Sequence, residues 1–290
     1  VATWIARGVR RRKVLRGWKR PKRFDRNLVV IGAGSAGLVT AYIAAAVKAR
    51  VTLVEKGAMG GDCLNTGCVP SKTLIRTAHF AHDVARHPAL GAASASATFD
   101  MGQVMDRVHR VVGTIAPHDS VERYEGLGVE VIQGEARVTG PWSVEAGGRT
   151  LTTRNIVVAT GAEPIVPAIP GIEETGYLTS DTLWELRGNP GRLLVLGGGP
   201  IGCELGQAFQ RLGARVTILE MAPRLLSGED AEVSDFVEAR LRAEGVTVHT
   251  GWRAVRFEGS VGEGGAGGTA GRTAVAEPGP GSGHDGTLRI

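Results

Sequence analysis

The residues in this chain that are most clearly able to take part in a reaction are two cysteines close together in the sequence. Four residues separate Cys63 from Cys68 in the run Gly60-Gly61-Asp62-Cys63-Leu64-Asn65-Thr66-Gly67-Cys68-Val69-Pro70-Ser71-Lys72. Two sulfurs can bond when their Cα atoms lie about 4.4–6.8 Å apart, and a tight turn of this length can meet that condition. Beside a redox cofactor, such a pair can store two electrons and pass them on.

Two other roles are open for these thiols: a pair of buried structural cysteines, or half of a metal site. A structural zinc site usually needs a second pair of ligands, and Cys203, the third cysteine, is isolated in the sequence. Cys68 is also predicted to begin a helix, whose dipole would stabilise a thiolate there. The sequence therefore favours a redox role for these two cysteines over a structural role, and it predicts no metal site.

A glycine-rich motif, Gly32-Ala33-Gly34-Ser35-Ala36-Gly37, precedes the cysteines, and Glu55 follows eighteen residues after Gly37. Gly32 permits a tight turn, Gly34 lets a pyrophosphate approach the backbone, and Gly37 lets a helix pack closely on a strand. The phosphates would then meet the free N–H groups at the helix N-terminus. Glu55 can accept hydrogen bonds from a ribose, so the motif predicts a dinucleotide site.

The same pattern returns further along the chain. Gly197-Gly198-Gly199-Pro200-Ile201-Gly202 is followed by Glu220, again eighteen residues after the last glycine. A carboxylate at this position binds an adenosine 2′-hydroxyl and would repel a 2′-phosphate, which favours NAD over NADP. Arg224 lies nearby in the sequence and moderates that preference.

Each glycine motif joins a predicted strand to a predicted helix, and a second strand follows. This strand–helix–strand repeat predicts an α/β protein with two Rossmann-like domains in series, of the three-layer ββα type. We place a basic arm at residues 1–26, a first dinucleotide-binding domain at 27–162, to which the family resemblance given below assigns FAD, and an NAD-binding domain at 163–290. The predicted helices are 36–47, 68–86, 101–124, 201–212 and 231–244, and the predicted strands are 27–32, 50–55, 129–132, 136–138, 143–146, 155–160, 193–197, 215–220 and 246–249, with weak signals at 272–276 and 287–290.

The charge of the chain is concentrated at its beginning. Residues 1–26 hold eleven Lys and Arg but one acid, whereas the rest of the chain holds 23 basic and 28 acidic residues. The main body therefore gives no electrostatic sign of binding nucleic acid. Basic and apolar residues alternate irregularly through 4–26, which is typical of a membrane-surface segment, although a solvated terminus, a nucleic-acid arm or a targeting segment has a similar composition. Three cysteines suit a reducing, cytoplasmic compartment.

Together, the cysteine motif and the two glycine motifs resemble the class I pyridine nucleotide–disulfide oxidoreductases, whose members include dihydrolipoamide dehydrogenase, glutathione reductase and mercuric reductase. The resemblance runs from about Asn27 to Glu258. Asp62 and Thr66 depart from the commoner Thr and Val without touching the sulfurs.

The resemblance implies a role for each matched residue. Cys63 would be the interchange thiol that attacks substrate, and Cys68 the charge-transfer thiolate against the flavin. Lys72 would sit near flavin N5, paired with Glu204; from the residues alone, these two read as a surface cation and a helix carboxylate. FAD would be bound by Gly32, Gly34, Ser35, Ala36, Gly37, Glu55, Lys56, Gly61, Asp62, Cys63, Lys72, Ala136, Thr160 and Gly161, and NAD by Gly197, Gly199, Pro200, Ile201, Gly202 and Glu220.

The implied reaction takes a hydride from NADH to the flavin and electrons on to the Cys63–Cys68 disulfide, giving a dithiol that reduces a disulfide or metal-ion substrate; run backwards, it would oxidise a dithiol. The family works as a homodimer, with a C-terminal interface domain that supplies a His–Glu pair and is not recognisable before Ile290. The alternatives are a catalytically incomplete fragment, a peripheral membrane-docking module, or a flavin enzyme of another type, such as an NADH oxidase or monooxygenase.

Overall fold

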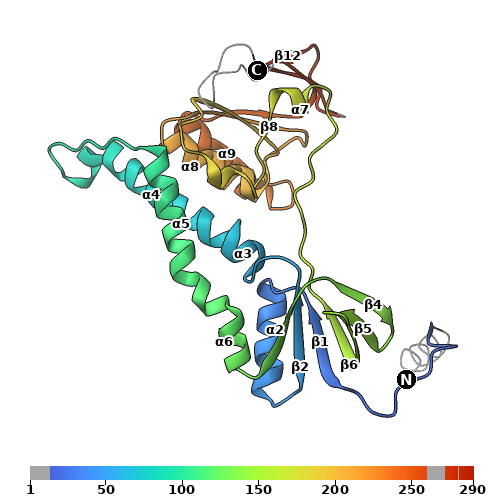
Figure 1. Ribbon diagram of the computed structural model, residues 1–290. Helices are drawn as coiled ribbons and strands as arrows, with labels where there is room; N and C mark the ends of the chain where they lie inside the picture. The colour runs from blue at the N-terminus through green and yellow to red at the C-terminus, as the bar shows by residue number, and fades with distance from the viewer. Residues whose placement is uncertain (1–13, 260–271, 280) are drawn as a thin grey trace. The chain divides into compact units, whose positions relative to one another are not determined.

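The computed structural model describes residues 14–259, 272–279 and 281–290. Residues 1–13 of the predicted basic arm and most of the glycine-rich stretch after Gly259 therefore lie outside the described residues. The chain divides into two compact units, each with its own sheet (Figure 1). Unit 1 comprises Val1–Asn65 and Val112–Glu163, and unit 2 comprises Thr66–Val111 and Pro164–Ile290. The domain limits read from the sequence stay a prediction.

Unit 1 is built on a six-stranded sheet in the order β3-β2-β1-β6-β5-β4. Strands β3, β2, β1 and β6 run parallel to one another, whereas β4, β5 and β6 are joined as an antiparallel meander. The elements of this unit are β1 (Arg26–Ile31), α2 (Ser35–Ala46), β2 (Val51–Glu55), α3 (Gly61–Asn65), the 3₁₀ turn η2 (Ala116–Asp119), α6 (Val121–Gly126), β3 (Val129–Gln133), β4 (Ala136–Gly140), β5 (Ser143–Ala146) and β6 (Arg149–Val158).

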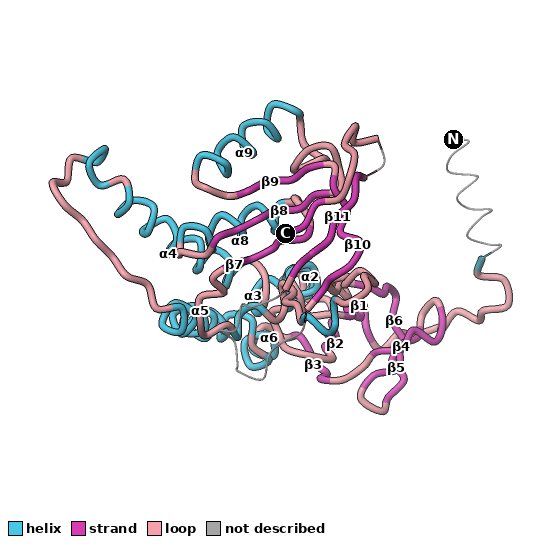
Figure 2. Tube along the Cα trace, turned by 90° about the horizontal axis from the view of Figure 1, so that it is seen from above, coloured by secondary structure: helices cyan, strands magenta, loops and turns pink. Residues whose placement is uncertain are grey.

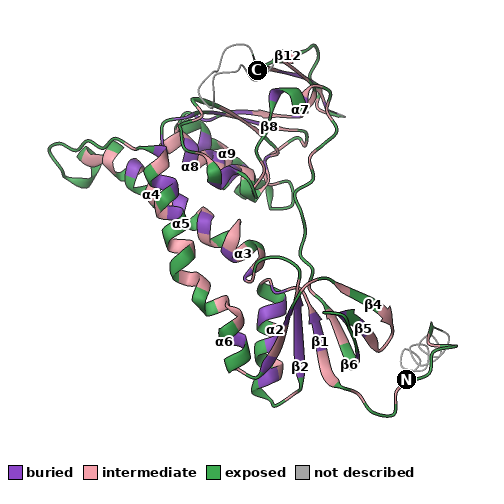
Figure 3. Cartoon of the chain, in the orientation of Figure 1, coloured by how far each residue is buried: buried purple, intermediate pink, exposed green. Residues whose placement is uncertain are grey.

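The strands of unit 1 are apolar on both faces because both faces are covered. Val30 and Leu53 pack in the cluster that contains α2, whereas their neighbours Val29 and Val54 pack with Val144 of β5 on the opposite face. Figure 3 shows this burial running along β1 and β2. Continuous apolar strands are what a doubly covered parallel sheet requires. The helix layer, the parallel sheet and the antiparallel strands confirm the three-layer ββα architecture.

Unit 2 repeats the parallel arrangement on a smaller scale. Its strands β7, β8 and β9 lie side by side and parallel (Figure 2), and β10, β11 and β12 form a separate antiparallel sheet. The elements are α4 (Cys68–Ala85), the 3₁₀ turn η1 (His87–Leu90), α5 (Met101–Ile115, whose last residues fall in unit 1), α7 (Ile172–Thr175), the 3₁₀ turn η3 (Leu183–Glu185), β7 (Arg192–Leu196), α8 (Pro200–Arg211), β8 (Arg215–Glu220), α9 (Ala231–Ala243), β9 (Thr247–Thr250), β10 (Trp252–Glu258), β11 (Thr273–Pro278) and β12 (Leu288–Arg289).

One apolar core joins the helices of unit 2 to its parallel sheet. Side chains from α4, α5, η3, α8 and β8 meet in it, namely Leu74, Met105, Trp184, Phe209 and Ile218. All five are at most 4% exposed. Helices α4 and α8 therefore pack as one body with the second glycine motif. Within the described parts of the chain, no helix is both long enough and apolar enough to cross a bilayer.

The predicted helix 101–124 is wrong as a single element. Helix α5 ends at Ile115, the 3₁₀ turn η2 follows, and α6 begins anew at Val121. Pro117 lacks the N–H that a continuing helix needs. Ser120 then caps α6, because its Oγ accepts a hydrogen bond from the Arg123 amide at 3.2 Å.

Two strand predictions also need correction. Strand β6 begins at Arg149 rather than 155, because Gly147 and Gly148 adopt φ of +56° and +70° and close a tight hairpin from β5. Such turns need positive φ at both central residues. Strand β10 was not predicted, although its partner β11, and β12 on the far side of β11, match the weak strand signals near the end of the chain.

A carboxylate ties the strands of unit 1 together. The Oε2 atom of Glu130 accepts a hydrogen bond from the Thr52 hydroxyl at 2.6 Å, and its Oε1 accepts one from Arg149 at 2.7 Å. Arg26 donates to Thr52 and also pairs with Glu130. Burial alone would raise the pKa of Glu130, but the hydrogen bonds from Thr52, Arg149 and Arg26 outweigh it and lower that pKa to about 2.

We predict that Glu130→Gln lowers the free energy of unfolding by about 1–2 kcal/mol at neutral pH, because Arg26 and Arg149 lose their anionic partner,. The Glu130 contribution is complete above its unfolded pKa of 4.5 and is lost as the pH falls toward 2,. Denaturant unfolding should therefore show a gap between wild type and variant that narrows on acidification. Glu125→Gln, at an exposed position in α6, is the matched control; an equal loss in both variants would contradict the prediction.

Candidate functional site

The first glycine motif forms a bare backbone turn between β1 and α2. Gly32 has φ +102°, and a Cβ there would lie 2.1 Å from the Ala159 carbonyl oxygen. A Cβ on Gly37 would lie 1.8 Å from the Gly32 oxygen. Gly34 occupies the N-cap of α2, and no described side chain caps that helix. The N–H groups of the first turn are therefore available to a phosphate.

Glu55 braces this turn from the end of β2. Its Oε2 accepts a hydrogen bond from the Ala33 amide at 2.5 Å, and its Oε1 accepts one from the Gly57 amide at 2.7 Å. A carboxylate has about four lone-pair positions, so roughly half remain for other donors. The brace sets the carboxylate beside the phosphate turn, where ribose hydroxyls could reach it.

The segment that carries Cys63 packs against the same turn. A Cβ on Gly61 would lie 2.6 Å from the Gly34 Cα, and the Gly60 amide donates to the Ala33 oxygen at 3.0 Å. A Cβ on Gly161, at the end of β6, would lie 3.7 Å from the Asp62 carboxylate. The unit therefore assembles Gly34, Gly61, Asp62 and Gly161 at the carboxyl ends of its parallel strands, where open α/β sheets bind ligands.

The other residues predicted for this site surround the same edge. The amide of Gly134, two residues before Ala136, donates to the Glu55 carbonyl at 2.7 Å, which places the start of β4 beside β2. Of the residues predicted for this site in unit 1, six are exposed: Ser35, Ala36, Lys56, Asp62, Thr160 and Gly161.

The second glycine motif, in unit 2, repeats the turn, the helix N-cap and the carboxylate brace of the first. Gly197 has φ +105°, and a Cβ on Gly202 would lie 2.2 Å from the Gly197 oxygen. Gly199 is the N-cap of α8, with Pro200 as the first helical residue and Ile201 exposed beside it. Glu220 accepts hydrogen bonds from the amides of Gly198 and Ala222, both at 2.6 Å. The first motif has the same brace.

The two cysteines lie at consecutive helices. Cys63 is half-buried in α3, and Cys68 is the exposed first residue of α4; the structure holds both in the reduced thiol form. Helix α4 is 18 residues long and its N-cap is Gly67, so its dipole favours a thiolate at Cys68. Cys203 differs, because burial raises the pKa of its thiol to about 11. A thiol in that state is a poor nucleophile, and Cys203 packs in the apolar core of unit 2.

Lys72 and Glu204 meet within unit 2. The Lys72 Nζ lies 2.6 Å from the Glu204 Oε2, joining α4 to α8 one turn beyond Cys68. The side chains are 61% and 48% exposed, and exposed ion pairs contribute at most about 1 kcal/mol to stability. The contribution of this pair to the stability of the fold is therefore small. Its main structural effect is to fix the position of the Lys72 ammonium group.

Trp184 is a residue of the site that sequence reasoning missed. Its indole N–H donates to the Thr66 carbonyl at 2.9 Å and to the Ser180 carbonyl at 2.7 Å. Thr66 lies between the two cysteines, so a buried indole holds the segment that joins them. A single Trp, 118 residues away along the chain, leaves no pattern that could have revealed this contact. Among the described residues, no group of three or more His, Cys, Asp or Glu is arranged to hold a metal ion.

Comparisons with known proteins agree with this geometry. The sequence model of the family described as Pyridine nucleotide-disulphide oxidoreductase matches residues 26–275. The mercuric reductase of Bacillus cereus is 36% identical over 235 residues, covering 81% of this chain and 37% of that protein. The mercuric reductase of Streptomyces lividans is 39% identical over 244 residues, covering 80% and 51%. The dihydrolipoyl dehydrogenase of Chlorobaculum parvum is 38% identical over 234 residues, covering 78% and 49%.

A solved structure is also similar. The HOCl-induced flavoprotein disulfide reductase RclA from Escherichia coli matches with a TM-score of 0.70 at 29% identity, over 91% of this chain and 54% of that one. The chain thus spans about half or less of the length of these relatives.

The close approach of Gly37 to Gly32 gives a test. We predict that Gly37→Ala lowers the free energy of unfolding of unit 1 by about 1–3 kcal/mol, because the added methyl group must displace a backbone carbonyl. Gly113→Ala is the matched control, since no atom lies within 4 Å of a Cβ at that helical position; it should be neutral or stabilising by up to about 1 kcal/mol. Denaturant unfolding measures both, and a Gly37→Ala variant as stable as wild type would refute the packing described.

Proposed function

Because this chain belongs to the pyridine nucleotide-disulphide oxidoreductase family, we propose that it exchanges electrons between NADH and a thiol or disulfide substrate through FAD and the Cys63–Cys68 pair. The observation that carries this proposal is the direct packing of Gly61, which leads into Cys63, on the phosphate turn at Gly34. This packing supports the proposal, because a dinucleotide bound at the Gly34 turn would lie beside the segment that carries Cys63. When bound there, FAD would supply the chemistry that links a nicotinamide to a disulfide.

The residues of unit 1 fit an FAD pyrophosphate. Gly61 approaches Gly34 so closely that a Cβ on Gly61 would lie 2.6 Å from the Gly34 Cα, so this side of the turn is bare backbone that phosphates could approach. Glu55 keeps lone pairs free for ribose hydroxyls beyond its two amide bonds. Ala136, Thr160 and Gly161 would border the cofactor at the ends of the neighbouring strands, together with the residues Gly32, Ser35, Ala36, Gly37, Lys56, Asp62 and Cys63.

The thiols divide the substrate chemistry between them. The Cys63 thiolate would attack a disulfide substrate, forming a mixed disulfide and releasing one substrate thiol. The Cys68 thiolate, favoured by the α4 dipole, would then attack Cys63, release the second substrate thiol and restore the Cys63–Cys68 disulfide. Two electrons thus leave the protein for each substrate disulfide reduced. Reversal oxidises a dithiol, and a ~30 mV difference between the couples shifts the equilibrium about tenfold.

Lys72 and Glu204 would control charge beside the redox pair. Glu204 holds the Lys72 ammonium at 2.6 Å on the face of α4 that carries Cys68 one turn earlier. A fixed cation at this place would stabilise negative charge on a reduced cofactor or on the Cys68 thiolate. We assign these two residues to the positioning of charge.

Unit 2 would bind the nicotinamide dinucleotide at Gly197, Gly199, Pro200, Ile201 and Gly202. We infer a preference for NAD over NADP, because Glu220 is fixed by two backbone amides and would repel a 2′-phosphate. Arg224, the nearby cation, donates instead to the Ser227 carbonyl at 3.2 Å. Its guanidinium is therefore partly engaged away from a bound phosphate.

The substrate and the oligomeric state are proposals about the whole protein. The relatives are mercuric reductases and dihydrolipoyl dehydrogenases, so a metal ion and a small dithiol are the two substrate classes to compare. We propose that the whole protein works as a homodimer.

The proposal predicts a spectroscopic signature. After reconstitution with FAD, anaerobic NADH should bleach the flavin and produce a long-wavelength thiolate–flavin band, and NADPH should do so less efficiently. Cys68→Ser should abolish the band while NADH still bleaches the flavin, because only the stacked thiolate is lost. Cys63→Ser should keep the band and lose all disulfide turnover.

Cys203→Ser is the matched control, since the raised pKa of this buried thiol keeps it protonated; its band and turnover should equal those of wild type. A band that survives in Cys68→Ser, or disulfide turnover that survives in Cys63→Ser, would overturn the assignment of the thiols. Failure of the wild type to retain FAD would overturn the proposal as a whole.

A further inference from the structure

A hollow of about 840 Å³ lies in unit 1 at the opposite end of the sheet from the phosphate turn. Phe24 and Asp25 immediately precede β1, Arg50 immediately precedes β2, and Arg154 lies in β6 beside the first residues of β1. Gly32, by contrast, follows the carboxyl end of β1. We call this feature the basic hollow, because five of its eight lining residues are cations: Arg20, Lys22, Arg23, Arg50 and Arg154.

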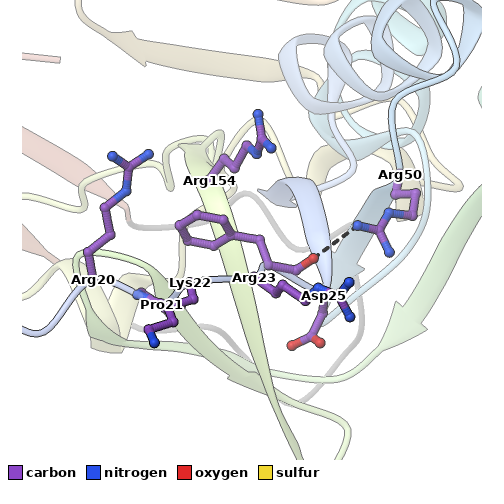
Figure 4. A pocket seen from close by; sticks show the side chains of 8 residues that line it. Arg20, Pro21, Lys22, Arg23, Asp25, Arg50 and Arg154 are labelled. Atoms are coloured by element: carbon purple, nitrogen blue, oxygen red, sulfur yellow. Dashed lines mark hydrogen bonds between the residues drawn. The ribbon is translucent and has the colours of Figure 1, made fainter.

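The positive charge of the basic hollow is only partly neutralised, since Asp25 is the one acid among its lining residues. None of the five cations forms an ion pair with a carboxylate in the described parts of the chain. The one acid of the lining, Asp25, accepts hydrogen bonds from the Thr152 amide and hydroxyl at 2.9 and 2.7 Å. In Figure 4 its carboxylate points away from the side on which Arg20 and Arg154 extend. A group of cations that outnumbers the nearby carboxylates in this way attracts an anion.

The segment that carries three of these cations is held against unit 1. The Arg50 guanidinium donates to the Phe24 carbonyl at 3.0 Å (Figure 4), and the Arg20 guanidinium lies 5.7 Å from the centre of the Phe24 ring. The Trp18 ring rests on β4, since a Cβ on Gly140 would come 2.7 Å from its Cζ3 atom. The cations are therefore arranged by the fold, which reduces the entropy lost when an anion binds.

Two apolar side chains lie exposed in the same segment. Val14 is 67% exposed, and Trp18 remains 51% exposed even though one part of its ring packs on Gly140. Exposed Trp beside Lys and Arg is typical of segments that lie in the membrane interface. A long polyanion such as DNA would instead need a broad basic surface, and residues 27–290 carry a net charge of −5 from 23 basic and 28 acidic residues.

From these observations we propose that the basic hollow binds phosphate headgroups of an anionic phospholipid surface. The guanidinium and ammonium groups would contact the phosphates, while Trp18 and Val14 enter the interface beside them. The bound surface would then lie at the amino ends of the parallel strands, remote from the carboxyl ends that bear the nucleotide turn. This assignment is independent of the redox chemistry.

The test is sedimentation of the full chain with vesicles of phosphatidylcholine alone or mixed with phosphatidylglycerol. Wild type should bind the mixed vesicles and not the neutral ones. The double variant Arg20→Gln/Arg154→Gln should bind about 25-fold more weakly, at about fivefold for each cation near the surface. The control, Arg123→Gln/Arg137→Gln, removes the same charge from exposed positions of unit 1 outside the hollow and should bind as wild type does.

Equal losses in the two double variants would overturn the proposal, since net charge alone would then explain binding. Binding to neutral vesicles, or no binding to mixed vesicles, would overturn it as well. A duplex DNA titration provides the competing outcome: hollow-dependent binding of DNA without binding of vesicles would reassign the site to nucleic acid.

A second inference, which rests on the proposed function, concerns Trp184. We infer that Trp184 is a positioning residue for the redox pair, because its indole N–H holds the carbonyl of Thr66 at 2.9 Å. Thr66 follows Cys63 by three residues and precedes Cys68 by two. The indole is 4% exposed and packed in the core of unit 2, so it offers a rigid anchor for the turn that a disulfide must close.

Trp184→Phe keeps a buried ring and removes the donor. We expect the thiol–disulfide equilibrium of Cys63 and Cys68 against glutathione, read by alkylation and mass spectrometry, to change about tenfold, which corresponds to ~30 mV. Trp184→His, which restores a ring N–H, should recover part of that change. Trp252→Phe, in the same unit but stacked on His284, should leave the equilibrium as in wild type.

The outcomes separate this inference from the proposed function. If the two thiols of the wild-type chain never form a disulfide, both the proposed function and the role of Trp184 are wrong. A wild-type chain that titrates normally, together with an unshifted and folded Trp184→Phe variant, would overturn only the role of Trp184.

Discussion

The structure of both nucleotide turns depends on one interaction, a carboxylate that accepts two backbone N–H groups. Glu55 binds the amides of Ala33 and Gly57, and Glu220 binds those of Gly198 and Ala222. Each carboxylate stands at the end of one strand and binds the turn that follows the adjacent parallel strand, β1 in unit 1 and β7 in unit 2. The turn is thereby fixed while its helix N-terminus stays open to phosphate, and charge-assisted bonds of this kind are about twice as strong as neutral ones.

Short-range rules account for the parts of this protein that could be read from its sequence. The glycines of both turns are required by contacts within a few residues or with the adjacent strand, so their spacing predicted the turns and the architecture around them. Cys68 at a helix N-terminus followed from the same local logic. The incorrect predictions also had local causes. Pro117 and Ser120 divide the segment that was predicted as a single helix over 101–124. The Gly147-Gly148 hairpin starts β6 several residues before the predicted strand.

Contacts between distant residues could not be read from composition or period. Lys72 and Glu204 are 132 residues apart, and their pairing was expected only from the resemblance to a family. Trp184 and Thr66 are 118 residues apart, and the basic hollow draws on three separate segments. Each of these depends on how helices and strands pack, which a one-dimensional pattern does not record. The same packing separates the two ends of the sheet in unit 1, with the nucleotide turn at one and the cations at the other.

The shared geometry of the two turns also bears on the history of the chain. The donor amide and the accepting carboxylate are 22 residues apart in both units, and the second donor follows each carboxylate by two. Matching offsets of this kind are what tandem duplication of one ancestral mononucleotide-binding segment would leave behind. After such an event, the two copies could keep the turn and its carboxylate and differ in the segments that follow them. The segment that carries the two cysteines follows the first copy alone.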